Sequence, residues 1–294
     1  MGKMAEYAFV AGTLSTFLAL VGYVFYALSG VRAARLAAAG VPVTTGRVGF
    51  VVGPRTTSIG HYATLLGWLG FALLGASLVF RAIATGHGPF SNMYEFSIAF
   101  AFGILGAYYW FEQRYHQRVL GLLALPVALA LLAYAATVPA EIEPLVPALQ
   151  NNLLLTVHVA TAIVAYGSFT VAFAAALLYL AQPETGRWGL PKPEVLDEIG
   201  YRAIVVGFPF LTLVIILGAL WADVAWGRYW GWDPKETASL VTWFIYGAYL
   251  HARVMRGWRG RKAAILLIIG FAATLLTYFG NLFFGGLHSY SGLG

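Results

Sequence analysis

The sequence predicts an all-helical protein that crosses a lipid bilayer about eight times, with both chain termini outside the cytoplasm. Hydrophobic residues make up 60% of the 294 residues and charged residues only 10%, which is more apolar sequence than a water-soluble core uses. Backbone groups in lipid must be satisfied within their own segment, so we expect apolar segments of about 20 residues to be helices. Eight such segments occur, at 6–28, 62–82, 92–110, 119–138, 152–181, 202–222, 235–255 and 263–285.

The orientation follows from the positions of the basic residues in the connections between these segments. Fourteen of the 18 Lys and Arg residues fall in alternate connections: Arg32, Arg35, Arg47, Arg55, Arg114, Arg118, Arg187, Lys192, Arg202, Arg253, Arg256, Arg259, Arg261 and Lys262. Only Lys3, Arg81, Arg228 and Lys235 are left for the other side. The connections rich in positive charge are therefore expected in the cytoplasm. This placement of the formal charge of +6 indicates contact with membrane lipid and not with nucleic acid.

We expect residues 1–294 to form a single integral membrane domain. Residues 1–61 would hold the first span and a cytoplasmic loop with a short amphipathic helix near 31–39, and residues 62–294 would form the helical core. The first apolar run follows neither a basic region nor a cleavage site, which indicates a retained span and not a signal peptide. The sequence contains no Cys, which excludes disulfides, thiolate metal sites and Cys nucleophiles.

The stretch 221–236 stands out between two apolar segments, on the side predicted to be non-cytoplasmic. It contains four tryptophans within twelve residues, namely Trp221, Trp226, Trp230 and Trp232. A few Trp residues are expected where a membrane helix meets water, but this density favours a surface for a large, flat, apolar ligand. The end of the stretch also has the pattern of a helix start, with Asp233 as cap, Pro234 at the first position and Glu236 at the third.

Two basic residues of this stretch have two possible roles. Arg228 and Lys235 are typical of solvated loop charges, and Asp223 or Glu236 would neutralise them. Beside an aromatic surface they would instead pair with carboxylates of the ligand through charge-assisted hydrogen bonds. The two propionates of a haem fit that second reading.

Without Cys, His is the only strong metal ligand left in a chain with few carboxylates at membrane depth. His158 lies about two turns into the fifth apolar segment, and His288 follows the eighth, both near the level of the tryptophan stretch. Each could be a structural His bonded to a neighbouring polar group. Together, two imidazoles from opposite sides would complete a six-coordinate haem iron.

His251 belongs to a different level of the membrane. It lies 17 residues after Pro234, which on one helix is roughly 25 Å, so it is too far to bind the same iron. It is either a His at headgroup level or a ligand of a second, inner site, for which His61 is at the matching level. His116 is expected to face solvent, and His87 to lie in an outer turn.

Several blocks of the sequence resemble a known family. The run from Trp226 to Thr237, with Trp243, Tyr246, Tyr249, Leu250, His251 and Arg253 after it, is similar to the WWD signature of the CcsA (ResC) cytochrome c biogenesis proteins. The blocks 86–95, 154–159 and 286–290 resemble the same family in order, so the resemblance covers roughly 80–294. The family usually has Trp where this chain has Ala238. The related CcmC and CcmF families continue differently after Trp232-Asp233.

The resemblance implies a subunit of the System II cytochrome c synthetase, which works with a CcsB (ResB) partner and presents haem b to the Cys-x-x-Cys-His motif of apocytochrome c. It implies that His158 and His288 are the axial ligands of an outer haem, and that Trp226, Trp230, Trp232 and Asp233 belong to the loop that contacts it. His251 would be one ligand of an inner haem whose second ligand is on the partner. The implied location is a bacterial plasma membrane, or a thylakoid membrane, with the active face on the non-cytoplasmic side.

Other functions stay open at the level of sequence. A membrane b-type electron carrier would hold its haems permanently and would be expected to have two His on one helix or on paired helices. A haem exporter would move haem without attaching it. A secondary transporter of a small anion would have broken helices at matched midplane positions, and Pro126 and Pro209 are the only hints of these.

Overall fold

The computed structural model describes residues 1–39, 54–142, 149, 152–183, 190–280 and 283–288. Within them the chain forms eight α-helices and one short 3-10 helix, and no strand. The helices are α1 (Gly2–Ala38), α2 (Pro54–Thr85), α3 (Met93–Tyr115), α4 (Gly121–Ala135, preceded by the 3-10 turn η1, Arg118–Leu120), α5 (Asn152–Leu180), α6 (Pro193–Trp226), α7 (Pro234–Met255) and α8 (Arg261–Phe279).

The prediction of an all-helical protein with eight long helices is confirmed, but several of their bounds are wrong. The expected loop over 29–61 is helical at both ends, because α1 continues to Ala38 and α2 begins at Pro54; residues 40–53 lie outside the described part. The amphipathic helix expected near 31–39 is thus the last part of α1. At the other end of the chain, α8 stops at Phe279 and not at 285. Hydropathy reports which part of a helix meets lipid, and a helix may continue beyond the bilayer.

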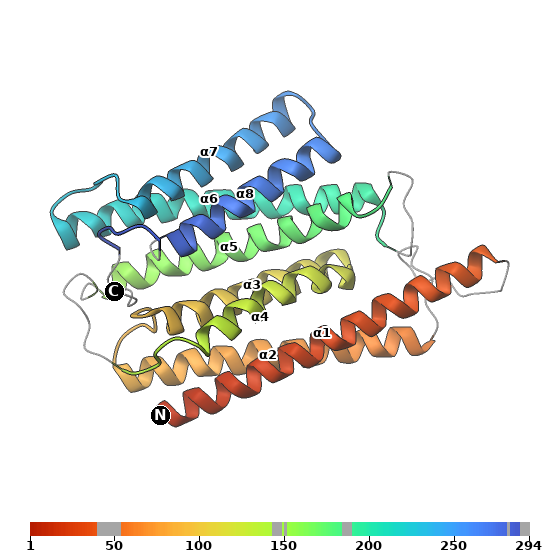
Figure 1. The fold of residues 1–294 in the computed structure, drawn as a ribbon, viewed down its shortest axis with the longest axis horizontal. Helices are drawn as coiled ribbons and strands as arrows, with labels where there is room; N and C mark the ends of the chain where they lie inside the picture. The colour runs from red at the N-terminus through yellow and green to blue at the C-terminus, as the bar shows by residue number, and fades with distance from the viewer. Residues whose placement is uncertain (40–53, 143–148, 150–151, 184–189, 281–282, 289–294) are drawn as a thin grey trace.

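The helices run alternately up and down in one bundle, so that α1 begins and α8 ends at the same end (Figure 1). We call this the outer end, following the orientation predicted from charge. The α1–α2 pair lies along one side, α3 and α4 in the middle, and α5 to α8 on the other side (Figure 1). Among the helices of the described residues, six are long and apolar enough to cross a membrane, and α3 and α7 are not among them.

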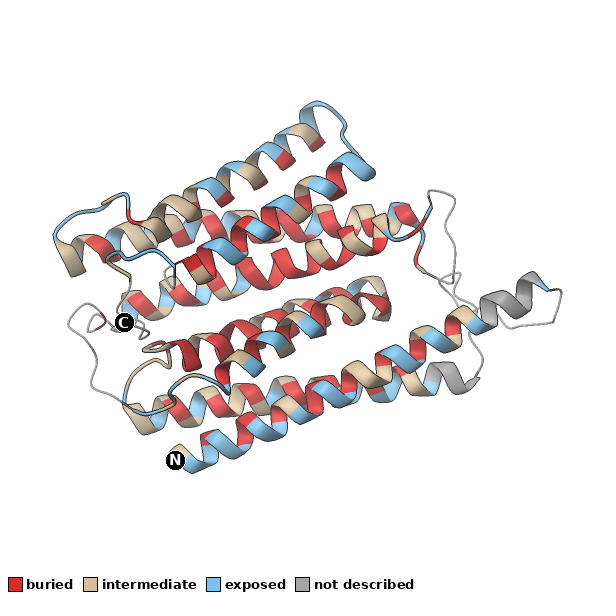
Figure 2. Cartoon of the chain, in the orientation of Figure 1, coloured by how far each residue is buried: buried red, intermediate tan, exposed pale blue. Residues whose placement is uncertain are grey.

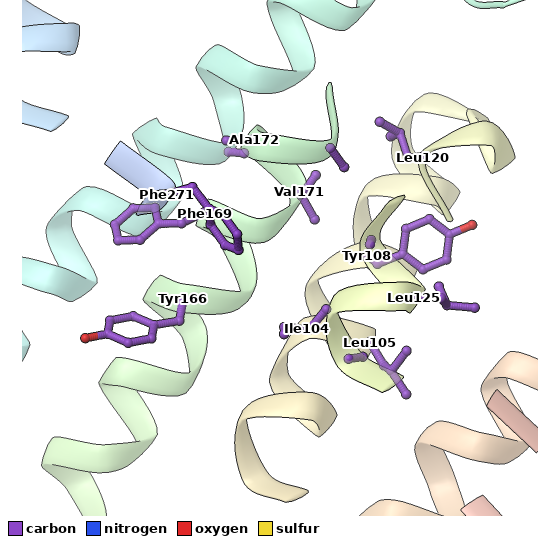
Figure 3. Packing of buried hydrophobic residues seen from close by; sticks show 14 of the residues in the cluster. Ile104, Leu105, Tyr108, Leu120, Leu125, Tyr166, Phe169, Val171, Ala172 and Phe271 are labelled. Atoms are coloured by element: carbon purple, nitrogen blue, oxygen red, sulfur yellow. The ribbon is translucent and has the colours of Figure 1, made fainter. Parts of the chain in front are cut away.

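The polar residues of α3 are tolerated because this helix is packed inside protein. It contacts α2, α4 and α5, and α3 and α5 each carry more buried residues than any other helix (Figure 2). Figure 3 shows the two sides of this core, with Ile104 and Tyr108 on α3 and Tyr166 and Phe169 on α5. The outward faces of α1 and α7 are exposed and rich in large apolar residues (Figure 2), as expected for lipid contact.

A buried carboxylate joins three helices towards the opposite, inner end. Glu112 of α3 accepts hydrogen bonds from Tyr23 of α1, Tyr108 of α3 and Thr64 of α2, each at 2.6 Å. The guanidinium of Arg118 lies 3.4 Å from the same carboxylate. A charge at membrane depth is costly unless it is paired and hydrogen-bonded. This network therefore holds α1 and α2 against the core.

At the outer end, a buried ion pair fixes the start of α3. Arg81 of α2 contacts Glu95 at 2.6 Å, with side chains 9% and 0% exposed. Glu95 also accepts from the backbone and hydroxyl of Ser91, and Arg81 donates to the Glu141 carbonyl. Glu95 is itself in the first turn of α3, where Asn92 caps the helix. The pair thus ties α2, α3 and two outer connections together.

Replacing Arg81 by Ala is expected to destabilise the bundle by about 3–5 kcal/mol, because it leaves the Glu95 charge buried and unpaired. Arg202→Ala is the matched control, since its pair with Glu198 is at the same distance of 2.6 Å but exposed and should contribute little to stability. Thermal unfolding of the detergent-solubilised protein measures both. Equal losses in the two variants would contradict a special role for the buried pair.

Candidate functional site

The connection between α6 and α7 is shorter than the sequence suggested. The expected segments 202–222 and 235–255 left 223–234 as the connection, but α6 continues to Trp226, so Trp226 is helical as well as Trp221 and only 227–233 connects the helices. Gly227 ends α6 in the left-handed conformation (φ 71°), and its N–H donates to the Asp223 carbonyl. Trp232 has φ 57°, a conformation that costs energy for a side chain of this size.

The predicted start of α7 is confirmed. Asp233 caps the helix, Pro234 occupies its first position, and Asp233 and Glu236 form a capping box. The Asp233 side chain accepts from the backbone of Lys235, and the Glu236 carboxylate accepts from the backbone of Asp233 and of Gly231. The box therefore holds the end of the 227–233 connection on the first turn of α7.

The same Asp233 carboxylate also binds the segment that follows α8. It accepts from the Leu287 N–H at 2.6 Å and contacts Nδ1 of His288 at 2.9 Å. Gly286 allows this approach, because a Cβ there would collide with the carboxylate. Burial alone would raise the pKa of Asp233, but the contact with His288 and the backbone donors lower it to about 2. The carboxylate is therefore ionised at neutral pH and orients the imidazole.

His288 itself is held between aromatic rings. Its ring lies 5.0 Å from Trp226 and 5.8 Å from Trp221, measured between centroids. Burial lowers its pKa below the ordinary value although Asp233 opposes the shift. The neutral imidazole, which is the form that binds metals, is therefore favoured.

His158 reaches the same place from α5. Its ring stacks on Trp221 with centroids 6.5 Å apart and planes 15° from parallel. It fits there because α6 has Gly218 beside it, where a Cβ would lie only 2.9 Å from Cε1 of the imidazole. Nδ1 of His158 is buried and has no hydrogen-bond partner among the described residues. Buried polar atoms are nearly always paired; the Val214 backbone lies near the ring but not in hydrogen-bonding geometry at Nδ1.

Both imidazoles line one cavity at the outer end of the bundle, and Trp221 packs against both of them. The cavity has about 960 Å³ of empty space, a volume that includes solvent at its open side. Its walls come from five helices, the α6–α7 connection and the segment after α8: Met93, Phe96, Phe100, Leu155, His158, Val159, Ala162, Tyr166, Val214, Ile215, Gly218, Ala219, Trp221, Tyr229, Trp230, Lys235, Glu236, Ser239, Thr277, Tyr278 and His288.

The structure separates the remaining residues of the tryptophan stretch. Trp230 and Lys235 line the cavity, and the Lys235 ammonium lies 5.9 Å from the centre of the Phe96 ring. Trp232 is 69% exposed and packs edge-on against Trp230. Arg228 is exposed and is not among the lining residues. Of the two basic residues, only Lys235 is therefore placed to meet a ligand in the cavity.

The other histidines lie elsewhere. His251 is exposed on α7, which is one continuous helix from Pro234, so the expected separation from the outer site holds. His61 is exposed on α2, on the side of the bundle opposite to α7 (Figure 1), and the structure does not bring it towards His251. His116 is exposed at the end of α3, and His87 contacts the Gly88 carbonyl in the turn after α2.

Sequence reasoning missed several residues of the cavity wall. Phe96 and Phe100 on α3, Tyr166 on α5 and Gly218 on α6 all line it. Of these residues, only Gly218 could have been suspected from the sequence, because it lies one turn before Trp221 on the same helix. The others look like ordinary core residues in a sequence, because only the packing of α3 and α5 brings them to the site.

The arrangement suits an iron whose other ligands come from the bound molecule itself. Among the described residues, no group of three or more His, Cys, Asp or Glu is placed to hold a metal ion alone. Two neutral imidazoles, an orienting carboxylate, a wall of indole and phenyl rings and one Lys fit a flat iron-containing macrocycle with acidic substituents. The broken helices of a transporter are not seen at Pro126 or Pro209, since α4 and α6 continue through them.

The chain is similar in sequence to proteins of cytochrome c maturation. Residues 90–288 match the family described as Cytochrome C assembly protein. Cytochrome c biogenesis protein CcsA of Gloeothece citriformis is 36% identical over 78% of this chain and 88% of its own length. The protein of the same name is 38% identical in Synechococcus elongatus, over 74% of this chain and 82% of its own length. In Porphyra purpurea it is 33% identical, over 82% and 90%.

The fold is similar to that of a solved structure, cytochrome c heme lyase CcmF. The two superpose with a TM-score of 0.58 over 92% of this chain and 46% of that one, at 21% sequence identity. At that identity the likeness concerns the arrangement of the helices alone.

Proposed function

The chain belongs to the Cytochrome C assembly protein family and functions in cytochrome c maturation, and from this premise we propose that it is the haem-presenting subunit of a cytochrome c synthetase. In this proposal haem b is the substrate of the outer cavity, and the acceptor is the Cys-x-x-Cys-His motif of apocytochrome c. The partner is a membrane protein of the CcsB (ResB) type. The membrane is a bacterial plasma membrane, or a thylakoid membrane, and the outer end faces away from the cytoplasm.

The observation that carries the proposal is the meeting of His158 and His288 at Trp221. The two residues are 130 positions apart in the sequence, yet both rings pack on the same indole and line the same cavity. His158 has a buried nitrogen without a partner, and His288 has one nitrogen occupied by Asp233. A carboxylate on the far nitrogen is the usual support of a metal-binding imidazole.

The rest of the cavity supplies the contacts that a porphyrin needs. Trp221, Trp230 and Phe96 offer flat apolar surface, and Lys235 at the wall pairs with a propionate. Trp232, exposed beside Trp230, lies where an incoming chain would first meet the connection. Arg228 is exposed nearby and would act on the acceptor or on a propionate that reaches the surface.

In attachment, each thiol S–H of the acceptor adds across a vinyl C=C of haem, forming one C–S and one C–H bond. The chain contributes orientation, because both axial ligands and the aromatic wall hold the macrocycle still while the thiols approach. His158 and His288 keep other ligands off the iron until the acceptor's own His replaces one of them. The proposal assigns no general base to this chain, so it would be one component of the synthase.

We assign His251 to an inner haem site shared with the partner. His251 is exposed on α7, in line with the exposed residues Val241, Phe244 and Ala248 on one face of this helix. An exposed imidazole at the end of an apolar stripe is a suitable place for a second protein to bring the other axial ligand. Because His61 lies across the bundle, the proposal places that ligand on the partner.

Enlarging Gly218 tests how closely the site is built around His158. We expect Gly218→Ala to lower the haem content of the outer cavity, because the added Cβ displaces the imidazole, and misplacement of about 1 Å can cost on the order of 10²-fold in function. Leu220→Ala, an exposed position on the same helix, is the control. Reduced-haem spectra of the purified variants are the measurement, and wild-type haem content in Gly218→Ala would contradict this geometry.

Transfer of haem tests the proposed function itself. Haem bound to the purified protein is expected to disappear from it when reduced apocytochrome c and the partner are supplied, and to reappear as covalent cytochrome c. The runner-up functions give other results. A b-type electron carrier would keep its haem and cycle between redox states, and a haem exporter would release haem without forming thioethers.

A further inference from the structure

The connection between α7 and α8 carries positive charge that no acidic side chain balances. We call residues 256–262 the basic turn; it lies at the inner end of the bundle and is exposed (Figure 2). Its four exposed basic residues are Arg256, Arg259, Arg261 and Lys262. Among the described residues none of the four has an ion-pair partner, whereas Arg118, Arg202 and Arg253 of the same end are all paired. No Asp or Glu follows Glu236 in the sequence.

An acidic residue of α6 holds the basic turn in one shape. The two oxygens of Asp197 contact the Arg253 guanidinium at 2.8 and 2.6 Å, and Oδ1 also accepts from the Gly260 N–H at 2.9 Å. Arg253 in turn donates to the Trp258 carbonyl at 3.3 Å. Gly257 and Gly260 have φ of 63° and 66°, a conformation that glycine adopts without strain. The exposed basic side chains are therefore attached to a backbone that is fixed against α6.

The basic turn also exposes aromatic and aliphatic surface. Trp258 is 39% exposed, and the Lys262 ammonium lies 5.7 Å from the centre of its ring. Val254 and Met255, just before the turn, and Ile265, just after it, are exposed as well. Trp and long basic side chains together are typical of the boundary between lipid and water, where each has an apolar part and a polar end.

The length of α8 places the basic turn at the level of lipid head groups. All 19 residues of α8, from Arg261 to Phe279, form a span apolar enough to cross a membrane. At about 1.5 Å per residue this span is roughly 28 Å long, close to the thickness of the hydrocarbon core. Arg261 and Lys262 begin the span, so they lie where the head groups of that leaflet begin. A cluster of basic residues directly beside a membrane helix is the pattern that binds anionic lipid.

We propose that the basic turn binds the head group of an anionic phospholipid in the leaflet at the inner end. Arg259, Arg261 and Lys262 meet the phosphate, and Trp258 packs beside the lipid at the boundary with the acyl chains. A zwitterionic lipid offers the same phosphate but cancels its charge with its own ammonium group, so the turn prefers an anionic lipid. An acidic protein or a nucleic acid would match the charge but would leave the exposed apolar side chains in water. None of these residues lines the outer cavity, so the inference is independent of the proposed function.

Lipid titration of the full chain tests this site. The detergent-purified protein is titrated with phosphatidylglycerol or with phosphatidylcholine of the same acyl chains, and the bound lipid is counted by native mass spectrometry. Glycerol 3-phosphate, which has the phosphate but no acyl chain, is added as a competitor. The test variant is Arg259→Gln, Lys262→Gln. The matched control is Arg114→Gln, Lys192→Gln, which removes the same charge from two exposed positions elsewhere at the inner end.

We expect phosphatidylglycerol to bind at least about tenfold more tightly than phosphatidylcholine. Each basic side chain at an anionic lipid surface contributes about fivefold in affinity, so the dissociation constant should rise roughly 25-fold in the test variant. The control variant should bind as the wild type does. Equal losses in the two variants would show a general attraction by positive charge and would overturn the site.

Other occupants of the basic turn give other results. Full displacement of the lipid by glycerol 3-phosphate would replace the lipid with a soluble phosphate. Equal affinity for the two lipids, together with binding of an oligonucleotide or of polyglutamate that the test variant loses, would replace it with a soluble acidic partner. Either result would overturn the proposal.

Asp197 separates a built site from simple attraction. Asp197→Ala raises the net charge by one, so simple attraction predicts tighter binding of phosphatidylglycerol. The same change releases Arg253 and Gly260 from their contacts, so a site that depends on the shape of the turn predicts weaker binding, and that is the result we expect. Unchanged or tighter binding in the folded variant would contradict the fixed turn as the site.

A pair of substitutions at Trp258 gives a further test that leaves the buried ion pair intact. Trp258→Phe keeps an aromatic ring beside Lys262 and should bind phosphatidylglycerol more tightly than Trp258→Ala does. Both variants keep all the positive charge, so the difference reports the aromatic contact alone. Equal binding by the two would remove Trp258 from the site.

Discussion

Replacing His158 or His288 by Ala is expected to empty the outer cavity of haem, to below about a tenth of the wild-type content, and to stop cytochrome c assembly. Under the proposed function, each variant removes one of the two imidazoles that would bind the iron. It also leaves an opening of the size of an imidazole beside Trp221. Added imidazole should therefore enter the opening and restore much of the haem content and of the assembly.

The measurement is the absorbance of the reduced protein together with haem staining of covalent cytochrome c, with and without imidazole. His61→Ala is the matched control, because this His is exposed on the far side of the bundle. If both outer-site variants keep wild-type haem and assembly, the assignment of the axial pair is wrong. Loss without rescue in both would indicate that the two residues act in folding and not as ligands.

The second large effect is expected at Asp233, where one carboxylate caps α7 and holds the segment 286–288. Asp233→Ala removes the contacts to Lys235, Leu287 and His288. Loss of such a support typically lowers metal affinity 10- to 100-fold, and loss of the cap costs about 1 kcal/mol more. Asp233→Asn keeps an oxygen that accepts hydrogen bonds but removes the charge. Compared with Asp233→Ala, it should therefore recover the capping of α7 more fully than the affinity for haem.

Two readouts separate these roles. Haem titration gives the affinity, and hydrogen exchange of the Leu287 amide, whose N–H donates to the carboxylate, reports the docking of the C-terminal segment in the absence of haem. Asp223→Ala is the control, since this residue is also acidic and lies near the end of α6 but is not among the cavity-lining residues. Wild-type affinity and full protection in Asp233→Ala would contradict the role assigned to Asp233.

Much of the fold could be predicted because the membrane restricts what an apolar segment can do. The eight helices follow from runs of apolar residues, and the start of α7 follows from Asp233, Pro234 and Glu236. The residues at which the helices end were harder to predict. The part of α1 with Arg32 resembles a loop in composition, yet it is helical, since a helix leaving the bilayer keeps its own hydrogen bonds in water.

Sequence analysis predicted which residues belong to the candidate site better than it predicted how they are arranged. The sequence pointed to His158, His288 and the tryptophan stretch, but it could not rank the tryptophans. Trp221 packs against both imidazoles, whereas Trp232 is mostly exposed. That difference depends on where α6 ends, and α6 continues through Trp226.

The sequence by itself determined the membrane class, the number of helices and the local start of α7, because each depends on neighbouring residues and on the cost of leaving backbone groups unpaired in lipid. Only the tertiary structure decided that Gly218 makes room for His158, that Asp233 reaches across to His288, and that Phe208 of α6 stacks on Trp243 of α7. These contacts join residues that are far apart along the chain or on different helices. They exist because packing of the helices sets the distances, and no local pattern encodes them.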